Sequence, residues 1–89
     1  MQKIKFDCGE KRHIKLLIHA ADNAPFRIKS VSWSLSYAGE ELNSGDGEII
    51  DHIIDVYVEV PEKKASYLLV VTYQINDETL VEQLELVVI

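Results

Sequence analysis

The stretch VSWSLSY, residues 31–37, decides the fold class of this chain, because its odd-numbered positions are apolar and its even-numbered positions are all serine. The same alternation recurs in YLLVVTYQI, residues 67–75, where positions 67, 69, 71, 73 and 75 are apolar. Successive side chains of a strand point to opposite faces of a sheet, so a period of two predicts strands with one face on a core. We therefore expect five of these residues in the structural core: Trp33, Leu35, Tyr67, Leu69 and Val71.

Two alternating segments precede this stretch. The first strand is predicted from three residues at even positions, Ile4, Phe6 and Cys8. The second has an aliphatic face made of Ile14, Leu16 and Ile18. Its opposite face carries His13, Lys15, Leu17 and His19. We expect Leu16 to join the core and the face with Lys15 and the two histidines to be exposed.

The third strand changes register along its length. Phe26 and Ile28 are apolar at even positions, whereas the apolar residues occupy odd positions from Val31 onward. A change of parity without a turn signal predicts a β-bulge near Lys29 and Ser30. Residues 22–25, DNAP, form a loop by composition before this strand.

Turn signals separate the remaining strands. A tight turn is predicted at residues 38–40, followed by a short edge strand at residues 41–43, and SGDG at residues 44–47 is the strongest turn cluster in the chain. The next strand ends before Pro61, bends near residues 49–53, and has its apolar residues at even positions: Ile50, Ile54, Val56, Val58 and Val60. The last two strands form a hairpin around residues 76–78, with one apolar face: Leu80, Leu84, Leu86 and Val88. This spacing predicts an all-β, antiparallel two-sheet sandwich of about seven strands, in a single domain spanning residues 1–89.

Composition and charge narrow the classes of function. The chain is 47% hydrophobic and has a single cysteine, so apolar burial rather than an internal disulfide must stabilise it. The net charge of −6 argues against nucleic acid as a partner, because phosphate binding needs a basic face. Residues 1–29 hold seven basic and three acidic residues, whereas residues 30–89 hold two basic and twelve acidic residues. This split is either an ordinary solvated surface or a dipolar domain whose basic part meets the acidic part of a neighbour.

The apolar runs are short. None approaches the roughly 20 residues that a membrane span requires. The first seven residues, MQKIKFD, lack the apolar stretch of a signal peptide. We therefore expect no secretion and no membrane partner, and a location in the cytoplasm or in a virion assembled there.

These segments together resemble the immunoglobulin-like fold. Trp33 stands in the third strand, where that fold places its core tryptophan, and Tyr67 stands at the tyrosine-corner position near the start of the sixth strand. Leu69 occupies a position that is a cysteine in antibody domains, and the partner position would be Leu16 or Ile18. The resemblance implies a sandwich of this kind without a disulfide, which suits a reducing environment.

A narrower likeness is to small immunoglobulin-like proteins encoded by tailed bacteriophages and prophages. Four segments carry it: SWSL at residues 32–35, NSGDG at 43–47, VEVP at 58–61 and YLLVVTY at 67–73. Such proteins serve as virion accessory or assembly components. The resemblance implies a structural role with protein partners, either copies of this chain or a phage structural protein.

Two groups of residues offer metal-ligating atoms, but the spacing argues against both. Cys8, His13 and His19, completed by Asp7 or His52, lack the paired spacing of a structural zinc site, so we expect a buried thiol and no metal. The carboxylates near the glycine-rich turn lack the later glutamate of the twelve-residue calcium loop: Asp46, Glu48, Asp51 and Asp55. An acidic sheet edge, which discourages aggregation, is the simpler interpretation.

Catalytic motifs are missing from the sequence, which has neither the glycines of a nucleophile elbow nor a phosphate-binding loop. We expect no enzyme activity and no cofactor. The leading hypothesis is a non-enzymatic structural or interaction domain, with Tyr37, Val87 and Ile89 in its contact surface. The alternative is a ligand-binding module in which exposed aromatic residues grip carbohydrate or peptide, although the alternation favours a core position for the first of them: Trp33, Tyr37, Tyr57 and Tyr73.

Overall fold

The computed structural model describes residues 1–19 and 25–89, and these residues form eight β-strands and no helix. The loop expected at residues 22–25 lies outside the described residues except for Pro25, which belongs to no strand. The strands are β1 (Gln2–Phe6), β2 (Lys11–Leu17), β3 (Ile28–Tyr37), β4 (Glu40–Asp46), β5 (Glu48–Ile50), β6 (Ile53–Glu59), β7 (Ala65–Ile75) and β8 (Glu78–Val88). The all-β prediction is confirmed, with one strand more than expected. Within the described residues there is no helix long and apolar enough to cross a membrane.

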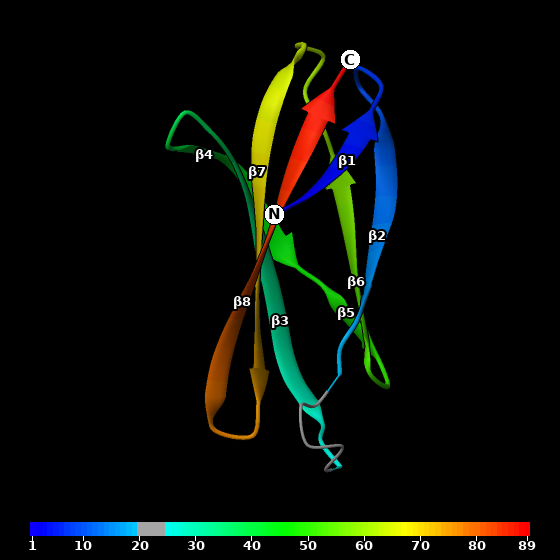
Figure 1. Cartoon of the computed structure of the whole chain (residues 1–89), viewed down its shortest axis with the longest axis vertical. Helices are drawn as coiled ribbons and strands as arrows, with labels where there is room; N and C mark the ends of the chain where they lie inside the picture. Colours follow the sequence, from blue (N-terminus) through cyan, green and yellow to red (C-terminus); the bar gives the residue numbers. More distant parts are fainter. Residues whose placement is uncertain (20–24) are drawn as a thin grey trace.

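The strands form two sheets that pack over a common core (Figure 1). One sheet has five strands in the order β1-β8-β7-β3-β4, and the other has three in the order β2-β6-β5. Neighbouring strands are antiparallel except β1 and β8, which run parallel, so the expectation of a wholly antiparallel arrangement is wrong at that edge. The reason is topological, because β2 enters the other sheet and leaves β1 to pair with the last strand of the chain.

The core consists of the inward faces of both sheets. In β3 and β7 the odd-numbered apolar side chains point inward, while the serines of β3 between them are exposed or half-buried. Of the residues expected in the core, five are buried and come from these two strands: Trp33, Leu35, Tyr67, Leu69 and Val71. Leu16, near the end of the edge strand β2, is only half-buried and packs against the margin of the core.

Two bulges interrupt the five-stranded sheet. The pairing of β3 with β7 shifts register between Ile28 and Ser30, where the change of parity predicts a bulge. A second shift lies in the pairing of β3 with β4, where Leu42 is the extra residue of the edge strand. This edge strand is longer than the three residues predicted, since it begins at Glu40 and ends at Asp46.

The turn predicted at residues 44–47 is wrong. Gly45 lies within β4, and Gly47 alone separates β4 from β5. The glycines are required by packing instead: a Cβ atom on Gly45 would lie 3.1 Å from Nε1 of Trp33, and one on Gly47 would lie 2.9 Å from Cγ1 of Val31 and 3.0 Å from the backbone oxygen of Asp55. The backbone therefore packs directly on core residues as the chain crosses from one sheet to the other.

Three two-residue turns join neighbouring strands. The turn predicted after β3 is confirmed, and Ala38 and Gly39 have φ of 50° and 83°, as a hairpin turn of type I′ requires. The hairpin of β7 and β8 turns at Asn76, which has φ of 55°. The bend expected near residues 49–53 is a third turn, between β5 and β6. It leaves Ile50 exposed, contrary to the expected core position, because Ile49 rather than Ile50 shares a face with the buried Ile54.

The first strand is shorter than expected. β1 ends at Phe6, and Cys8 lies in the following turn with an exposed thiol. The expectation of a buried thiol is therefore wrong. The turn begins early because Gly9 adopts φ of 72°, a conformation that favours glycine.

Tyr67 fixes the start of β7. Its hydroxyl donates a hydrogen bond of 2.9 Å to the backbone oxygen of Lys63, and its ring contacts that of Tyr37 with 5.5 Å between the centroids. Burial raises the pKa of the Tyr67 phenol above its ordinary value of 10.0, and the neighbouring Tyr37 and Cys8 raise it further. The side chain thus anchors the connection between β6 and β7 to the core.

Candidate interaction surfaces

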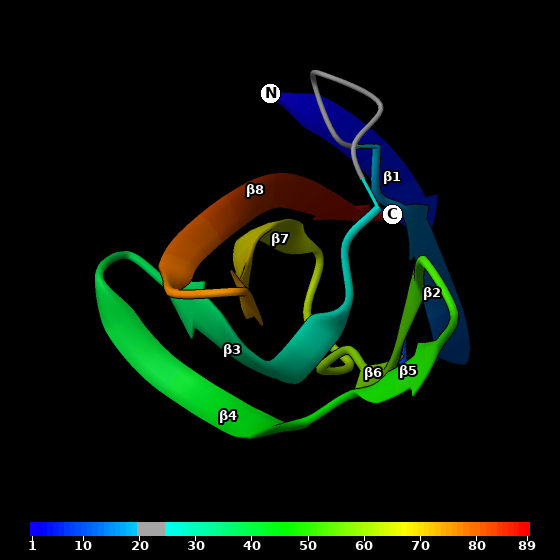
Figure 2. The same ribbon diagram turned by 90° about the horizontal axis from the view of Figure 1, so that it is seen from below.

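Neither sheet closes within residues 1–19 and 25–89, so four of the described strands have a free edge. These are β1 and β4 in the five-stranded sheet and β2 and β5 in the three-stranded sheet. The short segment 7–10 connects β1 to β2, and Gly47 alone connects β4 to β5. Figure 2 shows β1 and β4 at opposite ends of the layer formed with β8, β7 and β3. The molecule therefore has two open sides, one bounded by β1 and β2 and the other by β4 and β5.

The side bounded by β4 and β5 is acidic. Residues 40–51 contain no lysine or arginine and five acidic residues, which we call the acidic side: Glu40, Glu41, Asp46, Glu48 and Asp51. All five are exposed. None of the ion pairs between described residues involves any of them. Their charges are therefore directed into solvent along two adjoining free edges.

The side bounded by β1 and β2 is basic. Between residues 1 and 17 there are five basic residues, which we call the basic side, against two acidic ones: Lys3, Lys5, Lys11, Arg12 and Lys15. Two of the lysines form ion pairs, Lys3 with Glu85 at 3.7 Å and Lys11 with Glu59 at 3.6 Å. Exposed pairs of this kind contribute about 1 kcal/mol or less and leave the ammonium groups accessible.

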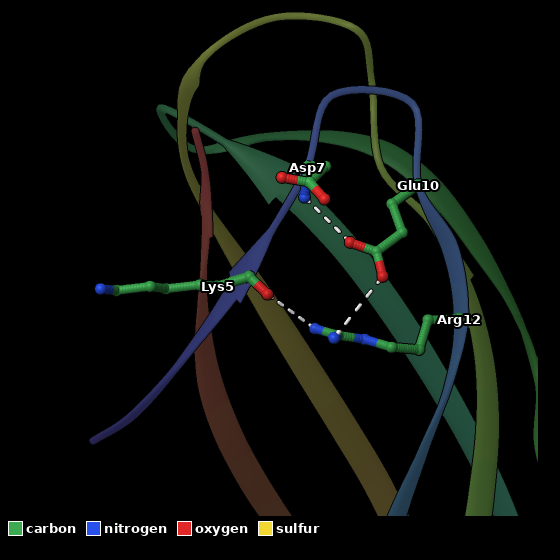
Figure 3. Close-up of polar contacts among 4 residues, drawn as sticks. All are labelled: Lys5, Asp7, Glu10 and Arg12. Carbon is green, nitrogen blue, oxygen red and sulfur yellow. Dashed lines mark hydrogen bonds and ion pairs between the residues drawn. The ribbon is translucent and has the colours of Figure 1, made fainter.

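Arg12 links the two sheets on the basic side (Figure 3). Its Nη2 donates a hydrogen bond of 2.7 Å to the backbone oxygen of Lys5, and its Nη1 lies 3.5 Å from the Glu10 carboxylate. That carboxylate also accepts a 2.9 Å hydrogen bond from the backbone N–H of Asp7. The guanidinium lies 4.0 Å from the centroid of the Phe6 ring. Since Arg12 belongs to β2 and Lys5 to β1, this hydrogen bond joins the free edges of the two sheets. A protein docking here would meet basic side chains and, at Lys5, a backbone oxygen that already accepts one hydrogen bond.

Asp55 is the one buried acidic side chain among the described residues, with 9% of its surface exposed. Its Oδ1 lies 2.9 Å from Nδ1 of the exposed His13. The imidazole in turn stacks on Tyr57, with 4.7 Å between the ring centroids. This arrangement satisfies the carboxylate by a local contact between β2 and β6.

The structure does not bring the candidate metal ligands together. Cys8 lies in a turn, and His13 faces Asp55 on the outer face of the three-stranded sheet. His52 stacks on Phe26, with ring centroids 4.1 Å apart. The four carboxylates of the calcium hypothesis are also separated, since three belong to the acidic side and Asp55 pairs with His13. In residues 1–19 and 25–89, no three His, Cys, Asp or Glu side chains are grouped to hold a metal ion.

The aromatic residues divide into core and surface. Trp33 and Tyr73 are buried, so they offer no binding platform. Tyr57 and Tyr37 are exposed, and Nζ of Lys63 lies 4.9 Å from the Tyr37 ring centroid. A surface depression of about 280 Å³ is lined by the two chain neighbours of Tyr37, Ser36 and Ala38, and by residues of other strands, but not by Tyr37 itself. These two tyrosines lie on different sheets, so they do not form one flat platform.

The expected contact residues of the last strand lie near the basic side. Val87 pairs with Lys5 of β1 and is half-buried, and Ile89 is 56% exposed. The backbone N–H of Ile89 donates a 2.9 Å hydrogen bond to Phe6, and its backbone oxygen accepts a weak 3.8 Å contact from the thiol of Cys8. Tyr37, at the end of β3, pairs with Glu40 of the acidic side, and its ring contacts that of Tyr67 on β7, the strand that separates β3 from β8.

The sequence revealed the opposite charges of these surfaces but not their positions. The positions of these charges depend on which strands become edges. In the fold, the basic residues lie on β1 and β2 and the acidic ones lie on or beside β4 and β5. The Arg12 network could not be found either, since it joins strands of different sheets. Comparisons of the chain with models of protein families, with curated proteins and with solved structures each found no match.

Proposed function

We propose that this protein is a non-enzymatic interaction domain that docks onto other proteins through the open sides of its two sheets. The observation that carries the proposal is the pair of unclosed sheets with four free edges, two of which are almost entirely exposed and carry acidic residues with no basic ones. Free edges and charged rims are the surfaces by which sheet proteins add partners. Exposed apolar side chains lie on or beside them, including Leu42 on β4 and Ile50 on β5.

We also propose that the fold is immunoglobulin-like. The strand order supports this. In the immunoglobulin-like fold, one sheet contains the third, sixth and seventh strands, and the other contains the second, fourth and fifth. Variable-type domains add an extra strand after the third, at the edge of the first of these sheets. Here β3, β7 and β8 share a sheet with the extra strand β4, and β2, β6 and β5 share the other. The first strand departs from the constant-type pattern, because β1 lies beside β8.

Two side chains give the same proposal local support. Trp33 is buried on β3, the position of the core tryptophan in the immunoglobulin-like fold. Tyr67 bonds back to the backbone oxygen four residues earlier, which is the contact of a tyrosine corner. Leu69 is fully buried two residues further on, where an antibody domain would carry a cysteine.

The proposal extends to a role as a virion accessory or assembly component of a phage or prophage. Its support is the resemblance of the four segments at residues 32–35, 43–47, 58–61 and 67–73. A domain that docks by its edges suits such a role, because assembly components act by holding neighbours. The identity of the neighbouring genes tests this origin directly, since capsid or tail genes beside this one are expected.

The alternative function is a ligand-binding module that grips carbohydrate or peptide. The exposed ring of Tyr37 and the ammonium group of Lys63 over it support this alternative. The burial of Trp33 and Tyr73 removes half of the aromatic set on which this alternative depended. A glycan or peptide array probed with wild type and Tyr37→Ala would reveal binding that requires the tyrosine.

Site-specific photo-crosslinking in the native host tests the docking function. A photoreactive residue replaces Leu42 on the β4 edge in one variant, and exposed Thr79, beside the turn of the β7–β8 hairpin, in the matched control. We expect a discrete protein adduct from position 42, with a second copy or with another protein, and none from position 79. Equal adducts from both positions, or none from position 42, would argue against docking by the acidic side.

A further inference from the structure

We infer that the open sides recognise each other, so that the basic side of one molecule docks on the acidic side of a second copy. This inference rests on the proposed docking function and names its partner. The starting observation is that one domain carries two exposed surfaces of opposite charge on different edge strands. The basic side is bounded by β1 and β2, and the acidic side by β4 and β5.

The residue pairing within each sheet connects opposite charges at its two free edges. In the five-stranded sheet one continuous row of paired residues runs from the basic to the acidic side: Lys3, Glu85, Leu68, Ser36 and Glu41. In the three-stranded sheet a corresponding row consists of Lys15, Asp55 and Glu48. Each row therefore begins with a lysine at one free edge and ends with a glutamate at the other.

In the docked arrangement that we infer, a second copy lies beside the first with its β1 next to β4 and its β2 next to β5, so that both rows continue. Its Lys3 then faces Glu41 of the first copy, and its Lys15 faces Glu48. Cross-strand pairs of opposite charge stabilise neighbouring strands, whereas like charges directly opposite each other destabilise them. The same arrangement penalises contacts between two acidic sides or two basic sides. Charge thus selects a head-to-tail contact over a symmetric dimer.

The strand directions are compatible with this contact. Following the pairing across the five-stranded sheet, β1 and β8 are parallel, and β7, β3 and β4 alternate in direction, so β4 runs opposite to β1. A neighbour in the same orientation would therefore bring its β1 antiparallel to β4 and its β2 parallel to β5, since β2 and β5 both run antiparallel to β6. Because the contact surfaces are different, it is heterologous, and repeated contacts build an open row or a ring rather than a closed pair.

Sedimentation velocity with charge-reversed variants tests the inference. Wild type is expected to self-associate at about 50 mM salt and to dissociate at about 500 mM salt, where screening shortens the Debye length to a few ångströms. The variant Lys3→Glu/Lys15→Glu has two acidic sides, and the variant Glu41→Lys/Glu48→Lys has two basic sides. Each variant alone is expected to associate at least tenfold more weakly than wild type, corresponding to about 1.4 kcal/mol.

An equimolar mixture of the two variants provides the decisive outcome, because each supplies the side that the other lacks. We expect the mixture to regain salt-sensitive association. Matched controls carry the same changes of charge away from the open sides: Lys29→Glu/Lys64→Glu and Asp77→Lys/Glu78→Lys. These controls are expected to behave like wild type.

Three results would overturn the inference: a wild type that stays monomeric at millimolar concentration, variants that associate as wild type does, or a mixture that stays monomeric. If these occur while position 42 still cross-links to a different protein, the docking function stands and only the second copy is excluded as its partner. If position 42 also yields no adduct, the docking function fails as well.

Discussion

At the scale of single residues, Tyr67 and Tyr73 show how similar side chains differ in what they contribute. Both are buried tyrosines on β7, and burial raises the pKa of both phenols above 10.0, with Glu82 adding to the effect at Tyr73. Only Tyr67 donates a hydrogen bond between described residues, to the backbone oxygen of Lys63. The two positions therefore form a matched pair for measuring that bond.

We expect Tyr67→Phe to lower the free energy of unfolding by about 1 kcal/mol, because the backbone oxygen of Lys63 loses its partner while the ring still fills the core. Tyr73→Phe is expected to change it by less than about 0.5 kcal/mol. Urea titration followed by tryptophan fluorescence measures both values. Equal losses in the two variants would show that the contact to Lys63 contributes nothing of its own.

At the scale of elements, the passage from β4 to β5 is the least ordinary connection in the molecule. The chain changes sheets within a single residue, and Gly47 donates a hydrogen bond of 3.2 Å to the backbone oxygen of Val31 as it does so. Glycine is needed because of the close approach to Val31 and Asp55 rather than because of its backbone angles.

Gly47→Ala is therefore expected to destabilise the protein by about 1–3 kcal/mol, the usual cost of forcing extra atoms into a packed core. Its thermal midpoint should fall accordingly in a calorimetric scan. Ser44→Ala serves as the control, since Ser44 is exposed on the same edge strand and should unfold close to wild type. An unchanged midpoint for Gly47→Ala would mean that the backbone moves freely at this crossing.

The elements also show what the sequence can and cannot predict. The alternation in β3 and β7 predicts the buried faces, and the change of parity predicts the bulge before Val31, because both are local consequences of strand geometry. The turn predicted at residues 44–47 was wrong because a glycine is equally typical of a turn and of a close packing contact, and Gly45 and Gly47 make packing contacts. The parallel pairing of β1 with β8 joins the two ends of the chain, and no local pattern encodes it.

At the scale of the whole molecule, two sheets share a core and leave their outer strands unpaired. The molecule measures 42 × 21 × 20 Å, and β7, flanked by β8 and β3, lies in the middle of the larger sheet. Five of the seven basic residues of 1–29 lie on the basic side, and five of the twelve acidic residues of 30–89 lie on the acidic side. They face opposite ways because the first two strands are edges and so are the two strands after β3.

Amide hydrogen exchange of the dilute protein, resolved by residue, tests this arrangement most directly. Amides in the middle of a sheet exchange only when the structure opens, whereas those on a free edge exchange with little protection. We expect strong protection throughout β7 and weak protection in β5 and along β4, where only the amides that bond to β3 exchange slowly. Uniform strong protection across Glu40–Ile50 in a monomer would contradict this expectation, because the acidic side would then be covered from within.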